Sequence, residues 1–218
     1  MTAPAPASAA NPARRDWVEI VATVLLALAA VATAWSSYQA NRWNGEASKA
    51  SGRVNALRIN AARAQGLAQG QTQVDIAMFF QWVNATEADD PDLAEFYSTR
   101  FRPEFRPVFD AWQATAPLTN PGAPPTPFAM DEYQLQARAD SERFDAQADA
   151  TAVAVRESIQ RSANYVLAVV LFAVALFFAG MSTKLHGAGT RKSLLVVGCL
   201  IVLGTTAWIA TFPVSISV

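Results

Sequence analysis

Three stretches of the sequence contain no Asp, Glu, Lys or Arg, and they determine the expected architecture. They are residues 20–41, 162–183 and 193–218. Each exceeds the roughly 20 residues that a helix needs to cross a bilayer core of about 30 Å. We therefore expect an all-α integral membrane protein with three transmembrane helices, over residues 17–38, 162–183 and 193–213.

The chain between the first two spans carries two helical stripes of small and apolar residues. The first begins at Ala47 and repeats every three or four residues through Gln71 and Asp75. This heptad spacing predicts one helix running from the first span to about residue 84. The second stripe leads from Tyr133 into the second span. Together they predict an antiparallel extracytoplasmic helical stalk.

The two stalk helices have an expected register because both must leave the membrane at the same level. Paired residue numbers then sum to about 203. This places Tyr133 beside Gly70 and Ala137 beside Gly66, so these glycines are expected to make room for larger side chains across the seam. Asp131 and Glu132 are expected in the first turn of the second helix, where the helix dipole favours acids.

A small helical head is expected between the stalk helices. Aromatic residues recur at 97, 101, 105 and 109, with one more at 112, which gives one face of a helix. We expect this face to bury Phe79, Phe80 and Trp82 at the tip of the long helix, in a head with an aromatic core. Proline disfavours helical backbone in the residue before it, so we expect a break near Arg102 and a new helix with Pro103 in its first turn. Five prolines between 117 and 127 predict an extended strap.

These patterns divide the chain into consecutive segments. They are a disordered cytoplasmic tail (1–16), a first span (17–38), a long stalk helix (39–86), a head with a Pro-rich strap (87–130), a second stalk helix (131–161), a second span (162–183), a cytoplasmic loop (184–192), a third span (193–213) and an external C-terminal tail (214–218).

Charge placement predicts the orientation. Arg14 and Arg15 precede the first span, and Lys184, Arg191 and Lys192 lie between the second and third spans with no acid among them. The positive-inside rule puts both segments in the cytoplasm. The prediction is a bacterial cytoplasmic (inner) membrane protein with its N-terminus inside and its C-terminus outside. A cleaved signal peptide ending near Ala34 is the alternative for the first span.

Composition excludes several classes of protein. The chain of 218 residues is 52% hydrophobic and 16% charged, with a formal net charge of -1, which does not fit a polybasic nucleic-acid-binding protein. One histidine, His186, and one cysteine, Cys199, exclude metal or catalytic sites that need two of either within one chain. We predict no enzyme activity, no cofactor and no metal.

Three sets of residues are candidates for function. Polar seam positions and small residues in spans indicate register or self-association: Gln71, Asp75, Ala30, Ala34, Gly198 and Gly204. Aromatic and arginine residues of the head are a candidate partner surface: Tyr97, Arg100, Phe101, Arg102, Phe105, Arg106, Phe109 and Trp112. Polar residues within spans are candidates for an intramembrane path: Glu19, Thr23, Thr33, Thr205 and Thr206.

Four stretches of the chain resemble a family of small three-span bacterial inner-membrane proteins with no established activity. They are WVEIVATVLLALAAVATAWSSYQANRW, RFRPEFRPVFDAW, NYVLAVVLFAVALFFAG and WIATFPVS, about a third of the chain. The resemblance implies the architecture and the location, and it implies no reaction.

Our expectation for function is a non-enzymatic, homo-oligomeric membrane protein whose helical stalk acts as an assembly or interaction module. A lone hairpin with alanine seams buries little apolar area, and bundling several copies would bury more. Its partners would be the lipid bilayer, other copies of itself, and an envelope or membrane protein. The alternatives are an ion-conducting or mechanosensitive channel subunit and a membrane sensor subunit that signals through a partner.

Overall fold

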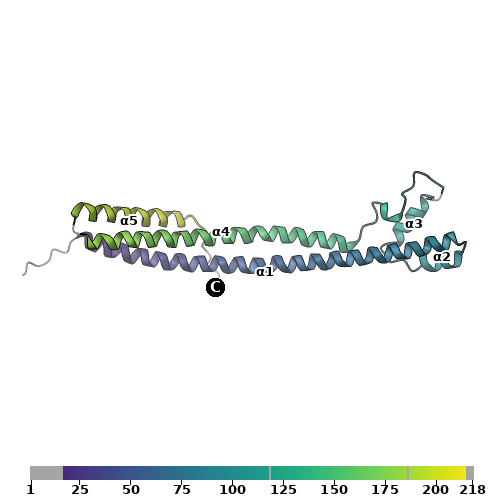
Figure 1. Cartoon of the computed structure of the whole chain (residues 1–218), viewed down its shortest axis with the longest axis horizontal. Coiled ribbons are helices and arrows are strands. Elements are labelled where there is room, and N and C mark those ends of the chain that lie inside the picture. Colours follow the sequence, from purple (N-terminus) through teal and green to yellow (C-terminus); the bar gives the residue numbers. More distant parts are fainter. Residues whose placement is uncertain (1–16, 118, 186, 215–218) are drawn as a thin grey trace, which may run out of the picture. The chain divides into compact units, whose positions relative to one another are not determined.

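The computed structural model describes residues 17–117, 119–185 and 187–214. The predicted tail over 1–16 with its arginines, His186, and residues 215–218 of the predicted C-terminal tail lie outside the described residues. All regular structure in the described part of the chain is helical (Figure 1). Three helices contain segments long and apolar enough to cross a membrane, with mean hydropathies of 2.1, 2.4 and 1.8.

Six helical elements follow one another along the described part of the chain. They are α1 (Trp17–Glu87), α2 (Pro91–Ser98), α3 (Arg106–Ala114), the short 3-10 helix η1 (Pro127–Ala129), α4 (Gln136–Lys184) and α5 (Ala188–Ile209). They form two compact units, and α1 and α4 contribute to both. Unit 1 contains the described residues of Met1–Ser48 and Val155–Val218, and unit 2 is Lys49–Ala154.

Unit 1 is held together by small residues from the apolar parts of α1, α4 and α5. Its buried core contains Ala22, Ala29, Ala168, Ala175 and Ala179 around larger side chains such as Phe172. Alanines let helix backbones approach closely, which is how helices pack where lipid surrounds them. Large apolar side chains on the outside stay exposed, among them Leu28, Val31, Val170, Leu200 and Leu203. This outside suits a hydrocarbon solvent.

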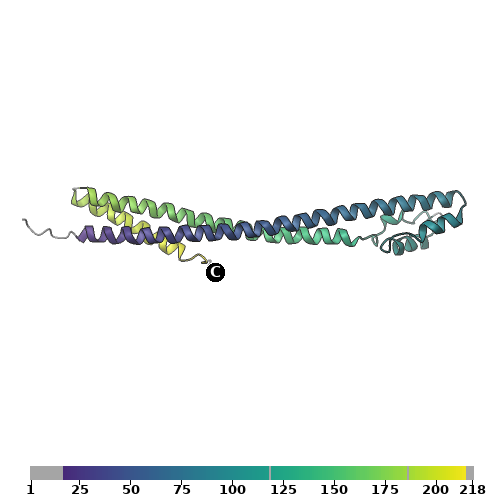
Figure 2. The same ribbon diagram turned by 90° about the horizontal axis from the view of Figure 1, so that it is seen from below.

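Beyond the apolar core of unit 1, near Ala40 and Ser162, α1 and α4 contact each other through polar and aromatic groups. The Ser162 hydroxyl donates to the Ala40 carbonyl at 2.9 Å. The Arg161 guanidinium lies 4.6 Å from the centre of the Trp43 ring, a cation-π contact. Figures 1 and 2 show α1, α4 and α5 as neighbours within this unit.

In unit 2, α1 and α4 contact each other through an alanine seam with few polar links. Ala61 and Ala68 of α1 and Ala148 of α4 are almost fully buried. The Ser141 hydroxyl donates to the Ala61 carbonyl at 3.0 Å. Arg58 reaches Asp145 and Asp149 at 2.5 and 2.6 Å. These ion pairs are exposed and contribute little to stability, so the seam itself holds this part of the pair.

The C-terminus of helix α1 is closed by backbone hydrogen bonds and not by a proline. The Ala88 amide donates to the Asn84 carbonyl, and the Asp90 amide donates to the Ala85 carbonyl. Asp89 between them has a φ of 54°, the left-handed conformation that commonly closes a helix and that Asp tolerates. Asp90 then caps α2, because its carboxylate accepts from the Leu93 amide at 3.0 Å.

Two helix starts differ from the sequence-based expectation. Helix α3 begins at Arg106 with Pro107 in its first turn, and Pro103 lies in the preceding turns. These turns place both Phe101 and Phe105 in the core. Helix α4 begins at Gln136 and not at Asp131. Tyr133 is held in a turn by the Met130 carbonyl, so the two acids precede the helix.

The last two helices are closer together than predicted. Helix α4 continues to Lys184 and α5 begins at Ala188, so Arg191 and Lys192 belong to a helix and not to a loop. The Arg191 side chain also donates to the Ser182 carbonyl at 3.1 Å, which fixes the first turn of α5 against the end of α4. The helix ends at Ile209, before the predicted end of the third span.

Candidate functional site

Unit 2 contains a buried cluster of aromatic rings from α1, from the turns before α3 and from α3 itself. We call Phe79, Phe101, Phe105, Phe109 and Trp112 the head core; all five are buried. Phe79 comes from α1, and its ring meets that of Trp112 edge-on at 5.3 Å between centroids. Such aromatic pairs contribute about 0.5–1.5 kcal/mol beyond their area burial. The cluster therefore ties α1 to the 99–114 segment.

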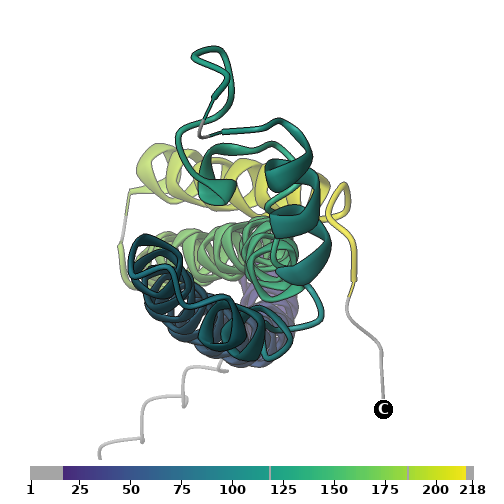
Figure 3. The same ribbon diagram turned by 90° about the vertical axis from the view of Figure 1, so that its right-hand side faces the viewer.

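The loop between α3 and α4 is tied to the head core at two points, although much of it extends away from the helices of unit 2 (Figure 3). The Trp112 indole donates to the Pro124 carbonyl at 2.8 Å. The Phe128 ring stacks on Phe105 at 5.2 Å with an angle of 2° between the planes. The predicted strap over 117–127 thus has anchors at its far end.

Asp75 is the one acid buried in unit 2 among the described residues, with 1% of its surface exposed. The Arg102 Nε donates to its Oδ1 at 3.0 Å, and the Tyr133 hydroxyl donates to its Oδ2 at 3.1 Å. Arg102 also pairs with Glu104 at 2.9 Å. The two carboxylate oxygens of Asp75 thereby link α1 to the loops on both sides of α3.

Burial sets the ionisation of this cluster. It raises the pKa of Asp75 above its ordinary value, and the neighbouring Arg102 opposes that shift without cancelling it. Burial also raises the pKa of the Tyr133 hydroxyl. A carboxylate and a phenol in these positions serve as acceptor and donor in a structural link.

Most of the aromatic residues predicted to form a partner surface are buried. Phe101, Phe105, Phe109 and Trp112 lie in the head core, so the expectation that their rings face a partner is wrong. Their four-residue spacing reflects burial in the chain's own core. Tyr97 is half-buried.

The arginines of that set bind within their own chain. Arg100 lies over the Phe96 ring at 3.6 Å. Arg106 donates to the Ser98 carbonyl at 3.1 Å and lies 3.5 Å from Asp110. With Arg102 held by Asp75 and Glu104, all three connect parts of the head.

The residues predicted for register or self-association fall in different environments. Gln71 is half-buried in the seam, and its Oε1 has no hydrogen-bond partner in the described part of the chain. Ala30 and Ala34 are exposed, away from the core of unit 1. A side chain at Gly198 would meet the Ala175 carbonyl and Leu25 at 3.4 Å, so this glycine serves packing inside the chain. A side chain at Gly204 would meet no described atom within 4 Å.

The predicted intramembrane polar residues do not gather into one site. The Thr23 hydroxyl donates to the Glu19 carbonyl at 2.8 Å, and the Thr33 hydroxyl donates to the Ala29 carbonyl at 2.7 Å. Both bonds lie within α1. Glu19 and Thr23 are exposed on the outside of unit 1, and Thr205 is buried.

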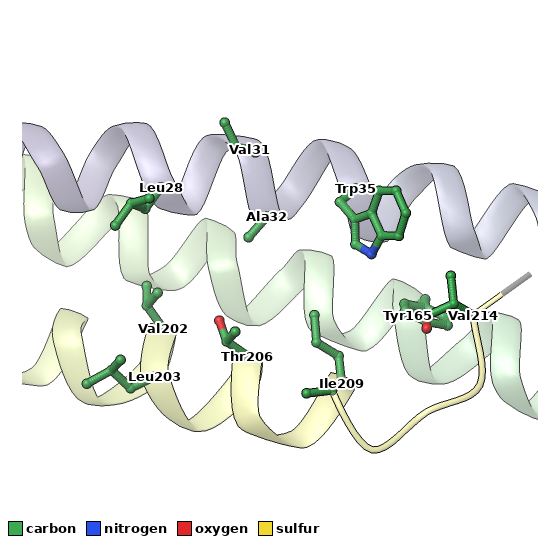
Figure 4. A pocket seen from close by; sticks show the side chains of 11 residues that line it. Leu28, Val31, Ala32, Trp35, Tyr165, Val202, Leu203, Thr206, Ile209 and Val214 are labelled. Atoms are coloured by element: carbon green, nitrogen blue, oxygen red, sulfur yellow. The ribbon is translucent and has the colours of Figure 1, made fainter. Parts of the chain in front are cut away.

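Thr206 is the member of that set that lines a groove in unit 1. The groove has a volume of about 520 Å³ and is bordered by α1, α5 and the segment after α5, with Tyr165 from α4. Figure 4 shows Leu28, Val202 and Leu203 towards one end and Trp35, Tyr165 and Val214 towards the other, with Thr206 between them. Its lining is almost entirely apolar, so it suits lipid chains better than water or ions.

The glycines of the long helix lie on the opposite side from the predicted one. Side chains built at Gly52, Gly66 or Gly70 would meet nothing within 4 Å. The expectation that Gly66 and Gly70 make room for Ala137 and Tyr133 is therefore wrong. Tyr133 instead bonds to Asp75 and packs beside Ala68 and Leu135.

These glycines belong to an outward-facing set of small and apolar residues. We call the following exposed residues the outer face of α1: Gly52, Ala56, Ile59, Ala62, Arg63, Gly66, Gly70 and Ala77. The corresponding outer face of α4 consists of Ala139, Glu142, Ala146, Ala150 and Val153, all exposed. A solvated helix face normally carries charged or long polar side chains. The signal was present in the sequence, at the heptad positions opposite the seam.

No known family model, curated protein or solved structure matches this chain. The family resemblance drawn from the sequence therefore stays a prediction.

Proposed function

We propose that this protein is an integral membrane protein whose copies assemble side by side, with α1 and α4 forming an antiparallel helical stalk outside the membrane. The stalk would act as an assembly or interaction module and would carry no catalytic function. The three long apolar helices support the membrane part of this proposal.

One observation supports assembly above the others: no other part of the described chain covers the outer face of α1. Ile59 is 52% exposed, and the glycines of this face have open space around them. Each glycine inside a helix costs roughly 1 kcal/mol relative to alanine. Gly52, Gly66 and Gly70 together weaken α1 by about 3 kcal/mol, and no contact among the described residues requires a glycine at these positions. A neighbouring helix at close range would use the space that they leave.

The mass of the complex tests this proposal directly. The full chain would be placed in lipid nanodiscs and weighed by native mass spectrometry, with dilution to follow dissociation. We expect a defined multiple of the 23.4 kDa chain. A monomer at every concentration, with the helix content intact, would reject the proposal.

The same preparation separates the two alternatives. A channel subunit requires three or more copies around a hole, and ion flux in liposomes that a bulky change such as Thr23→Trp abolishes. A sensor subunit requires a signalling partner that is retained on membranes with residues 49–154 present and lost when they are deleted. A closed assembly without flux and without such a partner supports the module.

Orientation needs its own test. In a Cys199→Ala background, single cysteines at Pro121 and Lys192 would be probed in intact cells with a membrane-impermeant thiol reagent. The proposed topology expects labelling at position 121 and none at position 192. The reverse pattern would place the stalk in the cytoplasm.

A further inference from the structure

We propose that the outer face of α1 packs against the outer face of α4 of a neighbouring copy, with Arg63 paired to Glu142 of that copy. This inference rests on the proposed function, and it names the partner of the outer face. The neighbouring chain is identified by shape, by charge and by the height of the two residues along the helices.

The shapes of the two faces suit each other. The outer face of α1 is built from glycine and alanine around Ile59, and that of α4 from alanine around Val153, which is 44% exposed. Helices with small residues at the contact approach to the near end of the usual 8–10 Å between axes. In unit 2, α1 and α4 already pack on each other through alanines, and the outer faces offer the same chemistry on the other side.

The charges of the two helices in unit 2 are opposite. Between Lys49 and Thr86, α1 carries four basic residues and a single acid, the buried Asp75. Between Gln136 and Ala154, α4 carries four acids and two arginines. A contact between α1 and α4 of different copies therefore joins a basic helix to an acidic one, whereas a contact between two α1 helices would bring like charges together.

Arg63 and Glu142 are the two charged residues best placed to form an ion pair between copies. Both are exposed on their outer faces, and neither forms an ion pair within the described residues. Two neighbouring arginines are already engaged: Arg58 holds Asp145 and Asp149, and Arg143 holds Asp140 at 3.1 Å.

The two side chains also lie at the same level. Ser141 bonds to Ala61 and Arg58 contacts Asp145, so Arg63 and Glu142 of one chain are within about one helical turn, roughly 5.4 Å, along the helices. Copies arranged around an axis normal to the bilayer place equal residues at equal heights. Arg63 and Glu142 of one chain lie at nearly the same height. Arg63 therefore also lies at the height of Glu142 of the next copy.

Such a contact joins two different surfaces, so it is heterologous. Each copy uses its outer face of α1 toward one neighbour and its outer face of α4 toward the other. Contacts of this kind close into a ring when the rotation between copies allows it. The outer faces of α1 and α4 would then be covered in every copy.

Charge reversal tests the pairing. Arg63→Glu and Glu142→Arg would be made singly and together in the full chain, and dissociation would be followed in nanodiscs. Each single change places like charges opposite each other, and we expect it to weaken association about tenfold or more, equivalent to about 1.4 kcal/mol. The double variant should recover most of the loss. Arg53→Glu, the same change at an exposed arginine of α1 outside its outer face, should have little effect.

A cysteine pair tests the geometry independently. In a Cys199→Ala background, chains with Gly66→Cys and chains with Ala139→Cys, carrying different tags, would be mixed and oxidised. We expect a disulfide between the two kinds of chain and none in either variant alone. A Gly66→Cys disulfide between like chains would overturn the heterologous contact.

The outcomes keep the two proposals apart. If the chain assembles but neither charge reversal changes association and no mixed disulfide forms, the interface proposed in this subsection is wrong and the assembly stands. If the wild-type chain is a monomer in nanodiscs, the proposed function itself fails.

Discussion

The hydroxyl of Tyr133 donates to the carboxylate of Asp75 at 3.1 Å across a sequence separation of 58 residues. The same carboxylate receives Arg102 from a separation of 27 residues. One side chain of α1 thus fixes the loops that precede α3 and α4. The core of unit 2 is therefore held by this connection as well as by its rings.

Removing the carboxylate should loosen unit 2. Asp75→Ala leaves the Arg102 guanidinium and the Tyr133 hydroxyl without their buried acceptor, and we expect a loss of about 2–3 kcal/mol. Tyr133→Phe removes a single bond and should cost about 1–2 kcal/mol. Tryptophan fluorescence during denaturant unfolding of the nanodisc-embedded chain measures both. Glu104→Gln, whose partner contact is more exposed, should change the midpoint little.

The stability of unit 2 should depend on pH through Asp75. Burial raises its pKa in the folded chain above the ordinary 3.8. The folded state therefore binds the proton of the Asp75 carboxyl more tightly than the unfolded state does. The contribution of this proton to the free energy of unfolding is fully present below pH 3.8 and is lost as the pH rises through the folded pKa. Unfolding midpoints measured from pH 3.8 upward should fall more steeply for the wild type than for Asp75→Asn. Identical slopes would contradict the raised pKa.

Trp112→Phe should release the strap while keeping most of the head core. The change removes the indole donor at 2.8 Å from the Pro124 carbonyl and should cost about 1 kcal/mol. Limited proteolysis should then cut faster within residues 117–127, without new cuts in α4. The matched control is Gln113→Ala, at an exposed neighbour in the same helix.

Gly198 should tolerate larger side chains less well than Gly204. A side chain at position 198 meets α4 and Leu25 at once, whereas the space around position 204 is open. We expect Gly198→Leu to destabilise unit 1 by about 1–3 kcal/mol through overpacking, and Gly204→Leu to have a small effect. Thermal unfolding in nanodiscs compares the two. Equal destabilisation would show that Gly204 has a packing partner outside the chain.

The regular parts of this fold were predictable because their signals are local. Charge-free stretches long enough to span a bilayer correspond to three helices with membrane-spanning hydropathy. The seam from Ala47 onward matches the buried positions of α1, including Ala61 and Ala68. Both features depend only on residue type and spacing.

The connections between distant parts were not predictable in the same way. Nothing near Asp75 in the sequence indicates that Arg102 and Tyr133 will reach it, because the path of the intervening loops decides that contact. The aromatic residues of the head were assigned both to a core with the tip of the long helix and to a partner surface, because spacing alone does not distinguish a buried face from an exposed one. The glycines were assigned to the seam although their heptad positions are opposite to it.

The link through Asp75 has a consequence for synthesis of the protein. The ribosome delivers α1 first, so Asp75, Phe79 and Trp82 are made before any of the residues that later cover them. Their cover is complete only when Tyr133 has been added. Until Arg102 and the aromatic residues of 101–112 have been added, the growing chain presents an unpaired carboxylate and bare rings, a state in which chains aggregate and chaperones bind. A chain that stops before Phe101 keeps those groups uncovered for its whole lifetime.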